Sequence, residues 1–331
     1  RWIDTFMATK ITEKIFLRLK AFLSKRGVIV AYVSYRRIIH GQKIYEQLIK
    51  KYGEDTIIYV QHYPGTGDVY ITCALLQKFH HMNYGEKIYV ITLIGQGAAK
   101  IAGLLGVDRV ELLTQKDSDA MISFCQFMGG IKNFNILHYK PIAMHTGILD
   151  MLAGYHDLDF MTMYLSTVFK GMRWEDAETF PKPHDIQNRI DEYFEEKGLQ
   201  KRKTVILFPF ANTIEDLPLD AWERLARHLR ELGFSVCTNA ACVEQVIPGT
   251  KKVFVPYEDI IPFVEEAGYV VSIRSGICDI IAAADCKKFI LYPTPNFYKF
   301  GVGTIFDYFS LKKMNIGKHL CELEFERTYT D

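Results

Sequence analysis

The chain has 331 residues, of which 49% are hydrophobic and 24% are charged, and its formal net charge is +1. This hydrophobic content excludes a disordered chain, and the small net charge gives no support for binding a nucleic acid through overall charge. A chain of this length usually folds as two domains of roughly 100–200 residues each.

The seven cysteines include no Cys-x-x-Cys pair. Their odd number indicates reduced thiols in a cytosolic setting, and we expect neither a disulfide framework nor a metal site. The longest apolar run, Val28 to Val33, is far shorter than the ~20 residues that a membrane-spanning helix requires. These features predict a cytoplasmic protein.

Residues 1–52 are expected to form an N-terminal helical segment. The first 26 residues carry seven Lys and Arg against two acids, and Ile11, Ile15 and Leu19 recur at helical spacing. This pattern fits two alternatives: a basic amphipathic helix on an anionic membrane surface, or a helix packed on the protein's own core with a solvated basic edge. A second helix is predicted from Ile38 to Lys51.

Strands and helices alternate over residues 53–183, which predicts an N-terminal Rossmann-like domain. Strands are expected at 56–60, 87–93 and 109–113. Helices are expected after the glycine-rich loop at 65–68, ending at Gly85, and at 98–105. The motif Pro181-Lys182-Pro183 is a candidate linker.

The alternation starts again over residues 184–331, which predicts a C-terminal Rossmann-like domain. Helices are expected at 185–197, 220–232 and 258–266, and strands at 204–208, 234–238, 252–255 and 288–292. Residues 271–284 predict a strand, a turn and a helix rich in small residues. The fold class is therefore α/β, with two Rossmann-like α/β/α domains that face each other across a cleft.

The loop Gly65-Thr66-Gly67-Asp68 follows the first strand. It lacks the third glycine of a dinucleotide-binding fingerprint, and Asp68 would repel a phosphate at the start of the helix. A carboxylate there has two interpretations: an N-cap of the helix, or a general base that faces the cleft between the domains. Ligands of open parallel sheets bind at the carboxyl ends of the strands, which favours the second interpretation.

The turn Arg274-Ser275-Gly276 has the character of a ligand-binding turn. A helix N-terminus offers unpaired backbone N–H groups, Gly276 allows a close approach to them, and Arg274 would add a planar cationic fork for phosphate. The alternative is an ordinary strand–turn–helix in which Arg274 is solvated.

Four motifs occur in the order seen in the heptosyltransferase-like family of GT-B glycosyltransferases, glycosyltransferase family 9. They are Gly67-Asp68-Val69, Phe208 to Asn212 ahead of a helix with Trp222, Leu232 to Val236, and Ser275-Gly276 leading to Tyr292-Pro293-Thr294. The chain resembles this family over residues 57–113 and 203–295. The resemblance implies a metal-independent, inverting sugar transferase of envelope or capsule polysaccharide synthesis, which takes a nucleotide-sugar donor and a glycan or lipid-linked acceptor. It also implies that the acid after the glycine acts as base and that no cofactor is needed.

The departures from this family concern the charges of the donor pocket. Arg274 stands where the family has an acid, Asp279 stands where it has a histidine, and the loop before the Trp222 helix lacks the usual lysine. We therefore expect Arg274 to take over the diphosphate contact. The expected catalytic residues are Asp68 and Arg274. The expected substrate-binding residues are Gly65, Thr66, Gly67, Asn212, Thr213, Tyr257, Glu258, Ser275, Gly276, Asp279 and Thr294.

Two alternatives to a transferase stay open. A sugar-nucleotide epimerase could use the same architecture without an acceptor. The altered residues Arg274 and Asp279 could also mark a non-catalytic, nucleotide-sugar-binding subunit of an envelope assembly complex. A dehydrogenase is disfavoured because neither half has a complete Gly-x-Gly-x-x-Gly fingerprint, and binding of a nucleic acid lacks a supporting motif.

Overall fold

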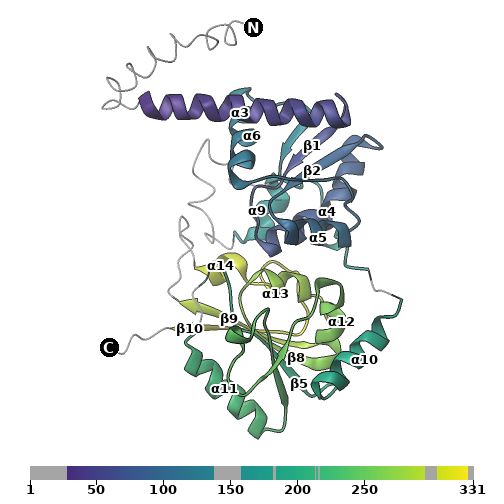
Figure 1. The fold of residues 1–331 in the computed structure, drawn as a ribbon, viewed down its shortest axis with the longest axis vertical. Helices are drawn as coiled ribbons and strands as arrows, with labels where there is room; N and C mark the ends of the chain where they lie inside the picture. The colour runs from purple at the N-terminus through teal and green to yellow at the C-terminus, as the bar shows by residue number, and fades with distance from the viewer. Residues whose placement is uncertain are drawn as a thin grey trace, which may run out of the picture.

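The computed structural model describes residues 28–137, 158–181, 184–212, 214, 217–294 and 304–326. These residues form two lobes, each built on one parallel sheet with helices on both faces (Figure 1). The predicted α/β class with two Rossmann-like halves is confirmed. The predicted basic helix within residues 1–26 lies outside the described residues. None of the described helices has the length and apolar character that crossing a membrane requires.

The first lobe holds a four-stranded sheet in the order β3-β2-β1-β4, with every pair parallel. All four side chains of the central strand β1 are buried, because helices cover both faces of the sheet. A strand in this position favours branched apolar residues. The strands are β1 Ile57–Val60, β2 Tyr89–Leu93, β3 Val110–Leu112 and β4 Phe134–Ile136. The helices are α3 Val28–Tyr52, α4 Thr66–Tyr84, α5 Gln96–Leu104, α6 Gln115–Phe127 and α9 Phe160–Thr167, with the 3-10 helix η3 Trp174–Asp176.

Helix α3 starts earlier than predicted and belongs to the first lobe. Its Ile44 and Leu48 are buried in one cluster with Ile58 and Val60 of β1 and Met121 of α6. It therefore lies across the outer face of the first sheet, together with α6 (Figure 1). The prediction that residues 1–52 form a segment apart from the first domain is wrong for the part that α3 covers, because its apolar face closes this core.

The second lobe holds a six-stranded sheet in the order β10-β9-β8-β5-β6-β7, again with every pair parallel. The strands are β5 Thr204–Phe208, β6 Ser235–Asn239, β7 Lys251–Val253, β8 Gly268–Ile273, β9 Lys287–Thr294 and β10 Leu320–Glu326. The helices are α10 Ile186–Lys197, α11 Leu219–Glu231, α12 Tyr257–Ala267, α13 Gly276–Ile281 and α14 Ile305–Phe309, with the 3-10 helix η4 Val243–Gln245. On one face of this sheet, Trp222 and Ala226 of α11 pack against Val205 and Leu207 of β5.

The described parts of the two lobes contact each other along their boundary. The rings of Phe160 in α9 and Phe309 in α14 stack with centroids 5.6 Å apart. The N-termini of α4 and α13 abut at Gly67 and Gly276. Helix α5 of the first lobe contacts α12 of the second, where Nζ of Lys100 lies 3.0 Å from Oε2 of Glu258.

The abutting glycines leave no room for a side chain. A Cβ on Gly276 would overlap the backbone nitrogen of Gly67 and lie 2.9 Å from Cβ of Thr66. Since backbone of a packed helix cannot rotate away, we expect Gly276→Ala to separate the lobes and to cost about 1–3 kcal/mol of stability. Small-angle scattering should record a larger radius of gyration, and thermal unfolding a lower Tm.

The matched control for this substitution is Gly97→Ala in α5, where a Cβ would meet nothing within 4 Å. Alanine in a helix is favoured over glycine, so this variant should unfold at or above the wild-type temperature. If Gly276→Ala matched Gly97→Ala in radius and Tm, the contact between the glycines would not limit the approach of the lobes.

Candidate active site

A cavity of about 1000 Å³ lies between the lobes. Its wall in the first lobe comes from the segment after β1, residues 65–68, together with Tyr63, Ile71, Lys100 and Phe160. Its wall in the second lobe comes from the segments that follow β5, β6, β7 and β8, which are residues 208–212, 239–241, 254–257 and 274–277. The carboxyl ends of the parallel strands thus face this cavity, as expected for open α/β sheets.

Asp68 lies in the first turn of α4 and lines the cavity, half-buried. The N-cap residue of α4 is Gly65, so the interpretation of Asp68 as the N-cap is wrong. Its carboxylate folds back over Gly65, where it occupies the space that a Cβ would need. The positive end of a helix stabilises a negative charge in this position. Asp68 therefore lies with its carboxylate at the wall of the cavity between the lobes.

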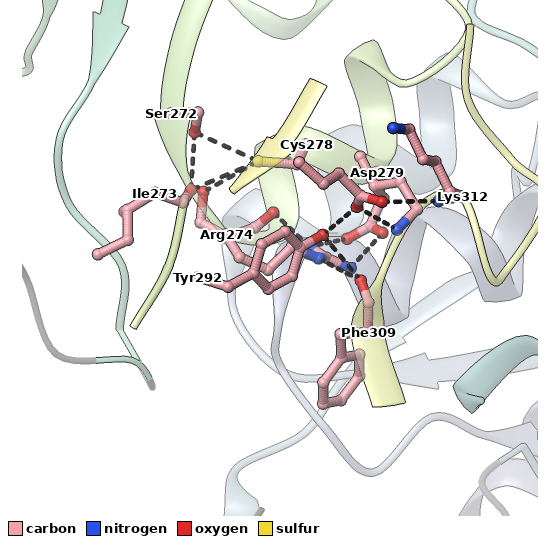
Figure 2. A network of polar contacts seen from close by, with 11 residues as sticks. Ser272, Ile273, Arg274, Cys278, Asp279, Tyr292, Phe309 and Lys312 are labelled. Atoms are coloured by element: carbon pink, nitrogen blue, oxygen red, sulfur yellow. Dashed lines mark hydrogen bonds and ion pairs between the residues drawn. The ribbon is translucent and has the colours of Figure 1, made fainter. Parts of the chain in front are cut away.

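Arg274 follows β8 and forms a buried, bidentate ion pair with Asp279 of α13 (Figure 2). Nη2 donates to Oδ1 at 2.7 Å and Nη1 donates to Oδ2 at 3.0 Å. Both side chains are at most 6% exposed. Burial alone would lower the pKa of Arg274, but the carboxylate of Asp279 raises it overall. Burial raises the pKa of Asp279, while Arg274 opposes that shift.

The remaining contacts of Arg274 fix the turn around it. Nη1 also donates to the carbonyl of Ser275 at 2.7 Å, and Nε donates to the carbonyl of Phe309 at 2.9 Å. The hydroxyl of Tyr292 lies 3.3 Å from the same Phe309 carbonyl (Figure 2). The prediction of an open cationic fork is therefore wrong, because protein acceptors already engage Nε, Nη1 and Nη2. The alternative of a solvated Arg274 is wrong as well, since the side chain is buried.

Gly276 also differs from the expectation. The predicted strand, turn and helix are present as β8 and α13, and Ser275 is the N-cap residue of α13. The space beside the Gly276 backbone is filled by Gly67 and Thr66 of the first lobe rather than left for a substrate. Asp279 is also close to Gly67, since its Cγ would lie 3.1 Å from a Cβ built there. These residues therefore join the lobes at the floor of the cavity.

Tyr257 and Glu258 begin α12, directly after β7 and its exit segment. The hydroxyl of Tyr257 lies 3.5 Å from Oγ1 of Thr66 in the first lobe. Oε2 of Glu258 lies 3.0 Å from Nζ of Lys100 in α5, also in the first lobe. Burial alone would raise the pKa of Glu258, but its own backbone N–H and Lys100 lower it overall. The carboxylate therefore stays charged against Lys100.

The other predicted site residues are placed as follows. Gly65, Thr66 and Ser275 line the cavity, and Asn212 lines it with an exposed side chain. Thr213 lies outside the described residues, and Thr294 ends β9 with a side chain outside them. Sequence reasoning missed Lys100 and the exposed aromatic residues Phe210 and Phe254, which also line the cavity. Among the residues that the structure describes, no three His, Cys, Asp or Glu side chains gather as metal ligands would.

Comparison with known proteins identifies the architecture. No protein-family model and no curated protein sequence matches the chain. Among solved structures, E. coli ADP-heptose LPS heptosyltransferase II aligns with a TM-score of 0.53 at 11% identity, over 81% of this chain and 90% of that one. The chain has a heptosyltransferase-like fold. The predicted GT-B arrangement is thereby confirmed.

Two further structures align at lower scores. A glycosyltransferase of family 9 from Veillonella parvula has a TM-score of 0.49 at 13% identity, over 82% of this chain and 86% of that one. The E. coli heptosyltransferase WaaC with ADP-2-deoxy-2-fluoro heptose has a TM-score of 0.42 at 12% identity, over 74% of this chain and 91% of that one. The resemblance stated from the motifs is confirmed at the level of the fold by the alignment with heptosyltransferase II alone.

Proposed function

We propose that this chain is a metal-independent, inverting glycosyltransferase. It moves a sugar from a nucleotide-sugar donor to a glycan or lipid-linked acceptor in the synthesis of envelope or capsule polysaccharide. The observation that carries the proposal is the cavity of about 1000 Å³ between two Rossmann-like lobes, which is lined by Asp68 of the first lobe and by the strand ends of the second. The heptosyltransferase-like fold supports the donor class.

In the proposed reaction, Asp68 takes the proton of an acceptor hydroxyl. The acceptor oxygen attacks the anomeric carbon from the face opposite the nucleotide, and the bond from that carbon to the phosphate oxygen breaks. The configuration at the anomeric carbon inverts, and the nucleoside diphosphate leaves with the bonding electrons. The position of Asp68 at the cavity, after the carboxyl end of β1, supports this role, because a general base must lie within reach of the acceptor hydroxyl.

The second lobe would hold the donor at the segments after its strands. We assign the nucleobase and ribose to the neighbourhood of Tyr257 and Glu258, and a polar contact to Asn212, because these residues follow strand ends at the cavity. We place the diphosphate near Ser275, whose carbonyl Arg274 holds in position. Arg274 and Asp279 then act as positioning residues rather than as ligands. We further place the enzyme in the cytoplasm because of its odd number of cysteines, and peripheral to an anionic membrane because of the basic sequence of residues 1–26.

The test is binding followed by turnover with a defined panel. The wild-type protein is titrated by calorimetry with ADP, UDP, GDP and CDP, and then incubated with the sugar nucleotides of the preferred base in the presence of EDTA. We expect selective binding of one base and release of that nucleoside diphosphate in EDTA. Absence of binding to all four would overturn the proposal, and conversion of one sugar nucleotide into another without an acceptor would replace it with an epimerase.

A further inference from the structure

The cavity is poor in available cations, although the departing diphosphate of the proposed reaction carries a growing negative charge. Among the described residues that line it, the basic side chains are those of Lys100 and Arg274. The guanidinium of Arg274 is held by Asp279, Ser275 and Phe309, so its charge is already balanced by a buried carboxylate. A diphosphate in this cavity therefore needs another positive charge.

Lys100 is the side chain that meets this need. It extends from α5 of the first lobe, lines the cavity, and is 48% exposed. An ammonium on a flexible four-carbon stem can exchange one anionic partner for another without moving its helix. Its partner in this structure is the carboxylate of Glu258 in the second lobe, at 3.0 Å.

The partner of Lys100 indicates that this exchange is possible. Within the described part of the chain, buried Oε2 of Glu258 has no hydrogen bond of good geometry, so its contact with Lys100 is close but incompletely formed. Glu258 is charged and stands next to Tyr257 at the edge of the cavity. No well-formed hydrogen bond therefore has to break when the ammonium turns from Glu258 toward a diphosphate, which is the stronger, doubly charged acceptor.

We propose that Lys100 binds the diphosphate of the donor, and that its ion pair with Glu258 is the arrangement that the diphosphate replaces. This inference rests on the proposed function and adds a ligand from the opposite lobe to it. The donor would be held by the second lobe, while the cation that stabilises its leaving group comes from the first. Lys100 can reach the diphosphate only when the two lobes lie together. The nucleoside diphosphate should therefore leave the sugar only in the closed arrangement of the lobes.

The experiment compares nucleoside diphosphate with nucleoside monophosphate of the same base, using the base that the calorimetric panel selects. In wild type the diphosphate should bind more tightly than the monophosphate. Lys100→Met should weaken binding of the diphosphate about 10- to 100-fold, as expected for a lost charged contact, and leave the monophosphate nearly unaffected. The ratio of the two affinities is the readout, because a disturbed fold would weaken both ligands together.

Two further variants sharpen this test. Lys78→Met removes an ammonium that pairs with Asp176 at 2.5 Å within the first lobe, outside the cavity, and should leave the ratio unchanged. Glu258→Gln removes the competing carboxylate, so the ratio should stay or rise even if a ribose contact is lost. An unchanged ratio in Lys100→Met, with wild-type binding intact, overturns this inference alone. Absence of nucleotide binding to wild type overturns the proposed function and this inference with it.

Discussion

Asp68→Asn is expected to lower the rate of sugar transfer about 10²- to 10⁴-fold, which is the usual contribution of a general base. An amide has nearly the same shape as the carboxylate but cannot accept the proton of the acceptor hydroxyl. Because Asp68 belongs to the first lobe and the proposed donor segments belong to the second, binding of the nucleoside diphosphate should stay near its wild-type affinity. Turnover is followed as release of nucleoside diphosphate from the sugar nucleotide that the wild type uses.

The control for this variant is Asp108→Asn, an exposed aspartate in the loop before β3 of the same lobe. It removes one negative charge outside the cavity and should transfer sugar at the wild-type rate. Substantial turnover by Asp68→Asn would remove Asp68 from the role of base. Loss of both turnover and nucleotide binding would instead assign it to the structure of the floor between the lobes.

The alternation of strands and helices was predictable because local signals agree with the fold. The run that forms β1 is apolar and branched, as a doubly covered strand requires, and the helices α4 and α10 end at Gly85 and Gly198, both with positive φ. Strand β10 was not predicted, although its apolar and acidic residues alternate. Among the described strands its one neighbour is β9, and its Glu322 faces inward to accept hydrogen bonds from Tyr292 and Ser310. A strand that is stabilised by polar contacts with residues far away in the sequence is hard to predict from its own residues.

The sequence predicted where the candidate site lies but not which of its charged side chains pair with each other. The sequence placed Asp68, Tyr257 and Ser275 at strand ends, and all three line the cavity. It could not show that the side chains of Arg274 and Asp279 point at each other, since this depends on the geometry of the turn between β8 and α13. Lys100 was missed because a lysine in a short helix is usually a solvated residue. Only the approach of the lobes brings it to Glu258.

The buried pair of Arg274 and Asp279 gives the largest expected effect on stability. Arg274→Met leaves the carboxylate of Asp279 buried, 4% exposed, without its counter-charge, and it removes the hydrogen bonds that Arg274 donates to the carbonyls of Ser275 and Phe309. Breaking such a pair on one side costs about 3–5 kcal/mol, to be measured as the free energy of unfolding in urea. Arg224→Met is the matched control, because Arg224 pairs with Asp220 on the surface at 65% exposure and should cost at most about 1 kcal/mol.

The double variant Arg274→Met with Asp279→Asn distinguishes two roles of Arg274: holding the turn at Ser275, and binding the ligand directly. It leaves no buried charge at the pair and keeps side chains of similar size, so it should recover part of the stability that Arg274→Met loses. If this double variant binds the nucleoside diphosphate nearly as well as wild type, Arg274 acts by holding the turn at Ser275, as the contacts of its guanidinium indicate. If the double variant folds but no longer prefers the diphosphate over the monophosphate, we infer that in the wild type the guanidinium of Arg274 turns from Asp279 to bind the donor directly. If the single variant Arg274→Met lost no more unfolding free energy than Arg224→Met, the structural role of the pair would be contradicted.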